Sequence, residues 1–112
     1  MSQNLRECLK HLELVAQIKN AKTRASVLKD ISVKDCYYDA IHEITINALK
    51  GNVPLSTYQK SGLGRNKRKI KALLCAKKGP KKFRTKAVVQ SGGWIQYLIP
   101  AVGALLGNLI RN

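Results

Sequence analysis

The sequence AVVQSGGWIQYLIPAVGALLGNLI, at residues 87–110, places a double glycine directly before a nearly continuous apolar run. Within residues 94–110 only Gln96 and Asn108 are polar, and no residue is charged. A helix of this length would be about 26 Å long, because each residue adds about 1.5 Å. That length is close to the lower limit for crossing a bilayer. We therefore expect the segment to contact a membrane, and a buried hairpin or core helix is the alternative.

The run begins with two amphipathic aromatic residues, Trp94 and Tyr97, of the kind that membrane helices place at the bilayer interface. Pro100 lies near its middle, so we expect shallow or tilted insertion that perturbs a bilayer rather than a stable span. The side chains expected to contact lipid are Trp94, Tyr97, Leu98, Ile99, Pro100, Leu105, Leu106 and Leu109.

Basic residues are concentrated in the second half of the chain. The chain has 21 Lys and Arg against 6 Asp and Glu, a net charge of +15. Residues 1–50 hold 8 basic and all 6 acidic residues, whereas residues 51–112 hold 13 basic residues and no acidic one. A surface that serves only solubility normally mixes both signs. The asymmetry predicts a polyanionic partner, either nucleic acid or an anionic membrane surface, and an acidic protein is the less favoured alternative.

In the first half, apolar residues recur at steps of three and four, which predicts helices. Residues 5–18 form one such stripe, and residues 23–28 indicate a short second helix. Residues 33–49 form the clearest stripe, and Gly51 follows it at the left-handed position that ends many helices. Capping boxes are expected to begin at Asn4 and at Ser32.

These patterns predict an all-α fold with a small three- to four-helix bundle at its N-terminal end. Because small domains bury a lesser share of their surface, we expect stability to depend on self-association or on a partner. The expected parts are a helical bundle at residues 1–59, a basic helix and extended basic linker at 60–86, a Gly-Gly junction at 87–93 and a separate apolar, membrane-active or anchoring helix at 94–112.

Between residues 60 and 86, twelve of 27 residues are basic. Residues 65–78 carry a narrow apolar stripe, which predicts an amphipathic helix, and residues 81–86 are expected to be extended and exposed. Basic residues spread in this way contact phosphates, which carry no sequence information. Binding should therefore be non-specific and driven by counterion release, and a single aromatic residue, Phe83, favours duplex DNA over stacked single strands. The expected contact residues are Lys60, Arg65, Lys67, Arg68, Lys69, Lys71, Lys77, Lys78, Lys81, Lys82, Arg84 and Lys86.

The three cysteines, Cys8, Cys36 and Cys75, are far apart and form no CxxC pair, which favours reduced and mostly buried thiols. His11 and His42 have no metal-ligand spacing, and His42 is expected to be a partly buried structural residue. The N-terminus is polar rather than the apolar stretch of a secretory signal. No catalytic arrangement is recognisable, so we expect a non-enzymatic protein without a metal or cofactor.

A basic segment, the junction Gln90-Ser-Gly-Gly93 and an apolar tail with proline and glycines together resemble the adenovirus-like core protein precursor X, the precursor of the mu peptide. The pattern NVPLS-YQK at residues 52–60, followed by a basic helix and VQ-GG, also looks like small open reading frames of adenovirus-like and Polinton-type elements. The resemblance to the mu precursor covers about residues 60–110. It implies that a virion protease cleaves after Gly92-Gly93 and that residues 60–86 condense DNA. A flexible hinge at the two glycines is the alternative.

Two functions follow as expectations. The first is a DNA-associated virion core protein, in the virion or host nucleus, whose tail contacts a membrane or capsid proteins. The second is a tail-anchored or membrane-active protein of an intracellular membrane, whose lysines bind anionic headgroups, because basic residues beside a membrane segment are attracted to anionic lipid. An RNA- or ribosome-associated protein would explain the charge but leaves the apolar tail unaccounted for.

Overall fold

Periodic apolar residues form helices along almost the whole chain. The computed structural model describes the backbone of residues 3–111 and the side chains of residues 5–104 and 106. No strand occurs in that backbone, so the expected all-α class is confirmed. The α-helices are α1 (Gln3–Ala16), α2 (Ala21–Ile31), α3 (Asp35–Leu49), α4 (Thr57–Arg65), α5 (Lys67–Cys75), α6 (Lys81–Gln90) and α7 (Ile99–Arg111), with 3-10 turns η1 (Ala76–Lys78), η2 (Ser91–Gly93) and η3 (Ile95–Leu98).

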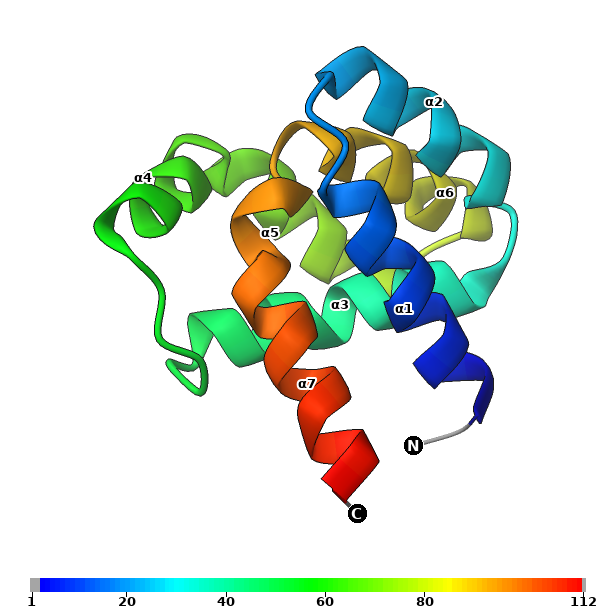
Figure 1. Ribbon diagram of the computed structural model, residues 1–112. Helices are drawn as coiled ribbons and strands as arrows, with labels where there is room; N and C mark the ends of the chain where they lie inside the picture. Colours follow the sequence, from blue (N-terminus) through cyan, green and yellow to red (C-terminus); the bar gives the residue numbers. More distant parts are fainter. Residues whose placement is uncertain (1–2, 112) are drawn as a thin grey trace.

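The helices surround one hydrophobic core. α1 and α7 lie side by side and run in opposite directions, and α3 passes behind both of them (Figure 1). α2 packs on α6 and η2, while α4 packs on η3 and α5 packs on α6. The largest side chains with almost no exposed surface are Leu9, Leu12, Leu28, Tyr38, Ile41, Ile44, Leu73, Val88, Trp94, Ile95, Leu98 and Val102.

Local signals explain several helix ends. Asn20 caps α2 by accepting a bond from the backbone N–H of Thr23. Gly51 has a φ of 76°, as expected for the glycine that ends α3. The expected box at Ser32 is wrong, because α3 begins at Asp35 and the Ser32 hydroxyl donates to the Lys29 carbonyl. The expected N-cap position at Asn4 is also wrong, because Asn4 lies within α1, which begins at Gln3.

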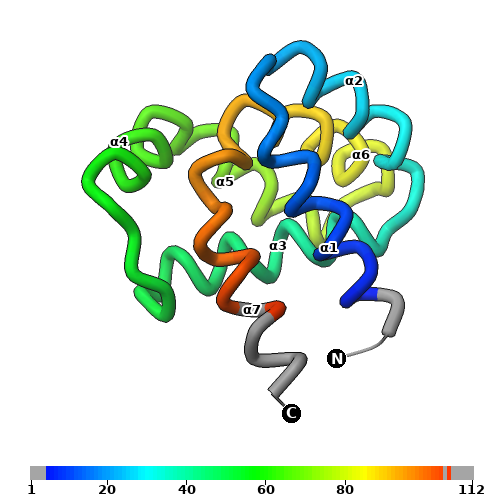
Figure 2. The backbone as a smooth tube through the Cα atoms, viewed as in Figure 1, coloured from blue at the N-terminus to red at the C-terminus, as the bar shows by residue number. Residues whose placement is uncertain are grey.

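Residues 81–86 are helical, so the expectation of an extended basic linker is wrong. They form the first part of α6, which begins directly after Pro80. Further along the helix, Ala87 and Val88 are buried in the core. This burial favours a helix that the density of positive charge alone would oppose. The tube in Figure 2 shows α6 running beside α2 rather than leaving the body of the protein.

The described side chains at the start of the apolar segment are part of the core, so the structure does not show the separate helix that we expected. Trp94, Ile95, Leu98 and Val102 have no exposed surface, and Tyr97 and Leu106 are also buried. Ile99 and Pro100 are partly buried, whereas the side chains of Leu105 and Leu109 lie outside the described residues. Within the described part of the chain, every helix is too short or too polar to cross a bilayer. The alternative expectation was a core helix, and α7 packs against α1 and α3 as such a helix would.

A buried cation links two segments that are far apart in the sequence. Arg24 on α2 is 2% exposed, and its Nε donates to the carbonyl of Gly92 at 2.8 Å. Its Nη1 donates to the carbonyls of Ile18 and Lys19, which end the turn after α1. A buried charge is tolerated only when it is hydrogen-bonded. Arg24 therefore positions η2 against the turn between α1 and α2.

The expectation of unpaired thiols is wrong for two of the three cysteines. Cys8 on α1 and Cys36 on α3 form a disulfide, with Cα atoms 6.3 Å apart. Cys75 is free, and it is exposed rather than buried. The pairing depends on the packing of α1 across α3, which brings together residues 28 positions apart in the sequence.

Replacing Arg24 with Met should lower the free energy of unfolding by about 2–4 kcal/mol, because the buried Gly92 carbonyl and the partly buried carbonyls of Ile18 and Lys19 lose their donor. Urea unfolding followed by circular dichroism measures the loss. Arg68→Met is the control, since Arg68 is exposed and its replacement should change stability by less than about 0.5 kcal/mol. Equal stability of the two variants would contradict the structural role of Arg24.

Replacing Trp94 with Ala should lower the free energy of unfolding by about 3–5 kcal/mol, since a buried ring is removed and a cavity remains. The same urea titration applies, and Leu14→Ala, at a side chain that is 66% exposed, is the control. A tail that projected into solvent or lipid would make Trp94→Ala as neutral as the control.

Candidate polyanion-binding surface

The basic residues predicted to bind phosphate lie on consecutive elements that contact one another. α4 carries Lys60 and Arg65, α5 carries four basic residues, η1 carries two and α6 carries four. All except the partly buried Arg84 are exposed. We call these twelve residues the basic surface: Lys60, Arg65, Lys67, Arg68, Lys69, Lys71, Lys77, Lys78, Lys81, Lys82, Arg84 and Lys86.

α5 shows how the sequence produces this surface. Ile70 and Leu73 are buried, and Leu73 also accepts a hydrogen bond through its carbonyl from the buried Tyr38 hydroxyl at 2.5 Å. Because a helix turns about 100° per residue, Lys67 and Lys71 fall one turn apart on an exposed side. The narrow apolar stripe is therefore present on α5. The single helix predicted over residues 65–78 is wrong, because Arg65 ends α4, α5 spans Lys67–Cys75 and residues 76–78 form the 3-10 turn η1.

A shallow pocket of about 420 Å³ joins α5 to α6. It is lined by Cys75 from α5 and by Phe83 and Lys86 from α6. The Phe83 ring is 50% exposed, and the Lys82 ammonium lies 5.4 Å from its centre. The basic surface thus continues across two helices. The exposure of Cys75 was missed, since periodicity alone gives no reason for a cysteine on the polar side.

Two members of the basic surface form bonds with other residues of the same chain. The Arg84 Nε lies 3.5 Å from an Asp35 carboxylate oxygen, and its Nη1 donates to the Gly79 carbonyl. Arg65 donates to the Ser61 hydroxyl and to the Tyr97 hydroxyl. The bond from Arg65 lowers the pKa of Tyr97, because the guanidinium favours the phenolate. These two arginines have structural roles beside any contact with phosphate.

The predicted Gly-Gly junction ends in η2, which packs against α2 and α6. Gly92 is buried, and a Cβ there would lie 3.1 Å from the Ala25 backbone nitrogen, so the glycine lets η2 approach α2 closely. Gly93 is exposed, and Lys69 of the basic surface lies near it. The two glycines thus form part of a 3-10 turn anchored by Arg24.

His42 is partly buried beside the Tyr38 ring, with 5.8 Å between ring centres, as expected for a structural histidine. Burial lowers the pKa of His42, and the charge of Lys77 lowers it further. Within the described residues, no group of three His, Cys, Asp or Glu side chains is arranged to hold a metal ion.

No protein-family model, curated protein or solved structure matches this chain significantly. The chemistry of its own surfaces therefore carries the functional argument.

Acidification should weaken the fold through His42. Because its folded pKa lies below that of the unfolded chain, its contribution to stability is complete above the unfolded value near 6.5 and is lost as the pH falls below it. The melting temperature of the wild type should therefore fall more between pH 7.5 and 5.0 than that of His42→Gln. Equal decreases in the two proteins would contradict this role.

Proposed function

We propose that this chain is a non-enzymatic protein that binds duplex DNA without sequence preference through its basic surface. The observation that carries the proposal is the uniform sign of the charge: eleven of the twelve basic residues are exposed on adjoining helices, and residues 44–112 contain no acidic residue. Such a surface attracts a dense phosphate array and gains affinity from counterion release.

The side chains of the basic surface favour contacts with the backbone of the nucleic acid. Lysine is a point charge on a flexible stem, suited to phosphate rather than to bidentate reading of a base. The Phe83 ring is already close to Lys82, and binding of single strands generally uses several stacking aromatic residues. Both features favour duplex DNA over single-stranded nucleic acid.

In the biological setting implied by the resemblance, the chain would condense DNA inside a virion, with the virion or host nucleus as its location. Condensation requires contact with more than one duplex segment, so self-association is part of the proposal. Proteolysis after Gly93 by a virion protease also remains a proposal. The carbonyl of Gly92 is hydrogen-bonded and buried, so such cleavage would need local opening of η2.

Binding to anionic lipid is the second candidate, because the same lysines attract headgroups. The residues expected to enter a bilayer, such as Trp94 and Leu98, are buried. Insertion of an anchor would therefore require opening of the core, whereas phosphate binding requires no rearrangement. This difference supports the choice of DNA over lipid in the proposal.

The logarithm of the DNA association constant should fall with the logarithm of salt concentration with a slope near −5, if about six phosphates are neutralised at about −0.9 each. Replacing Lys77, Lys78, Lys81 and Lys82 together with Gln should flatten the slope by up to about 3–4 units, because four exposed cations are removed. Fluorescence anisotropy with two duplexes of unrelated sequence measures both the slope and the sequence preference.

The matched control changes the same charge elsewhere, with Lys10, Lys19, Lys22 and Lys29 replaced by Gln; all four are exposed in the first half of the chain. It should shift the slope by less than about 1 unit. Equal slopes for the two quadruple variants would show that the basic surface is not the contact. Strong binding to phosphatidylserine vesicles with weak DNA binding would favour the lipid candidate instead.

A further inference from the structure

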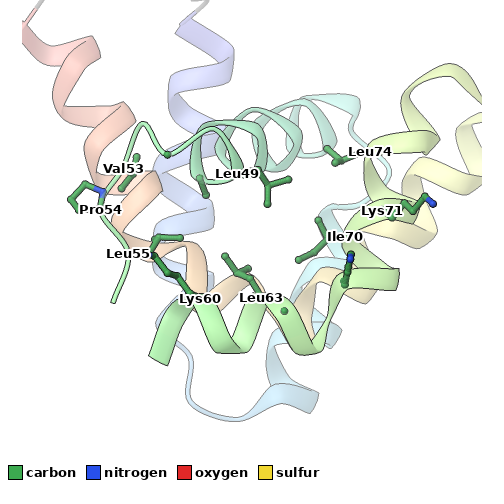
Figure 3. A pocket seen from close by; sticks show the side chains of 13 residues that line it. Leu49, Val53, Pro54, Leu55, Lys60, Leu63, Ile70, Lys71 and Leu74 are labelled. Atoms are coloured by element: carbon green, nitrogen blue, oxygen red, sulfur yellow. The ribbon is translucent and has the colours of Figure 1, made fainter. Parts of the chain in front are cut away.

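A larger pocket, of about 720 Å³, lies between the C-terminal end of α3, the loop at residues 50–56, α4 and α5 (Figure 3). Its walls are aliphatic. Leu49 from α3 faces Leu63 from α4 across the space, and Leu55 and Ile70 complete the walls beside them (Figure 3). The volume lies in the range of about 300–1,000 Å³ that is typical of small-molecule sites.

Local structure holds the pocket open. The left-handed Gly51 turns the chain away from α3, and the capping box between Ser56 and Gln59 fixes the start of α4. Of the wall residues, Leu63 and Ile70 are buried, whereas Leu49 is 56% exposed. An exposed leucine on the wall of a concavity is apolar area that a bound apolar group would cover.

The charged residues that line the pocket are all positive. Lys60 on α4 and Lys67 and Lys71 on α5 line it, and none of the lining residues is acidic or aromatic. A lining of this kind provides van der Waals contact for a flexible alkyl chain and cations for a single anionic group. An aromatic ligand would find no ring to stack on.

We propose that this pocket binds a single-chain fatty carboxylate, with its alkyl chain between Leu49 and Leu63 and its carboxylate beside the lysines. The charge complementarity and the aliphatic walls favour this occupant. A helical peptide would need a groove long enough for anchors over two turns, and here the loop at residues 50–56 forms one wall. The inference goes beyond DNA binding and stands without it, although three lysines belong to both sites.

A large side chain introduced at Gly64 would fill the pocket while leaving its three lysines in place. Gly64 lines the pocket from α4, and a Cβ at this position would meet no atom within 4 Å. Gly64→Trp should fill the space, while Gly64→Ala adds one methyl group and serves as the matched control. Circular dichroism and thermal melting establish that both variants fold.

The experiment is calorimetric titration of the full chain with sodium octanoate, decanoate and dodecanoate below their micelle concentrations. Affinity should rise roughly tenfold for each two added methylenes, with one site per chain, because each buried methylene contributes a similar free energy. Gly64→Trp should weaken dodecanoate binding at least tenfold and leave DNA affinity within twofold, and Gly64→Ala should change neither.

The charge contribution is tested with Lys60, Lys67 and Lys71 replaced by Gln, against a control with Lys19, Lys22 and Lys29 replaced by Gln. The first variant should weaken decanoate binding at least tenfold and decanol binding by less than threefold, and the control should weaken neither. Absence of saturable dodecanoate binding to the wild type would overturn the proposal whatever the variants do. Equal dodecanoate affinity of Gly64→Trp and wild type, or binding only of an acidic amphipathic peptide, would overturn it as well.

Discussion

The hydrogen bonds of the buried Arg24 guanidinium are the constraint on which the rest of the structure depends. A guanidinium without water needs acceptors in several directions, and here they are backbone carbonyls from the turn after α1 and from Gly92. These carbonyls are more than seventy residues apart in the sequence. Bringing them together draws η2 against α2, where the missing side chain of Gly92 gives the backbone of Ala25 enough room. Trp94, two residues after Gly92, then packs in the core with no exposed surface.

The basic surface rests on this buried C-terminal segment. The Tyr97 ring lies on Gly62 of α4, where any added side chain would overlap it, and the Tyr97 hydroxyl accepts from Arg65. Tyr38 fixes α5 through the Leu73 carbonyl. A chain with a net charge of +15 repels itself, so its cationic helices need apolar anchors of this kind. The segment first interpreted as a separable tail therefore supports the surface on which the proposed function depends.

Helical periodicity and the glycine that ends α3 were predicted from neighbouring residues, whereas the capping box at Ser32 and the long-range contacts were not. The 3.6-residue period predicted α1 and α3, and Gly51 marked the end of α3, because these features depend on neighbouring residues. Hydropathy at residues 94–110 could not distinguish a bilayer from a protein core, since both are apolar. Residues 81–86 were expected to be extended, but they form the first part of α6, and Ala87 and Val88 further along that helix are buried in the core. The Cys8–Cys36 disulfide depends on the crossing of α1 and α3, and the aliphatic pocket is assembled from α3, α4, α5 and a loop.

The two proposed sites share Lys60, Lys67 and Lys71, and this overlap has an energetic consequence. A carboxylate held beside these lysines reduces the positive charge available to phosphate, and phosphate bound there repels the carboxylate. Coupling between two ligands is reciprocal, so each must weaken the affinity for the other by the same factor. Nine of the twelve basic residues lie outside the aliphatic pocket, which limits the antagonism to a part of the DNA-binding free energy. An amphiphile would therefore reduce DNA affinity and its salt dependence without abolishing either.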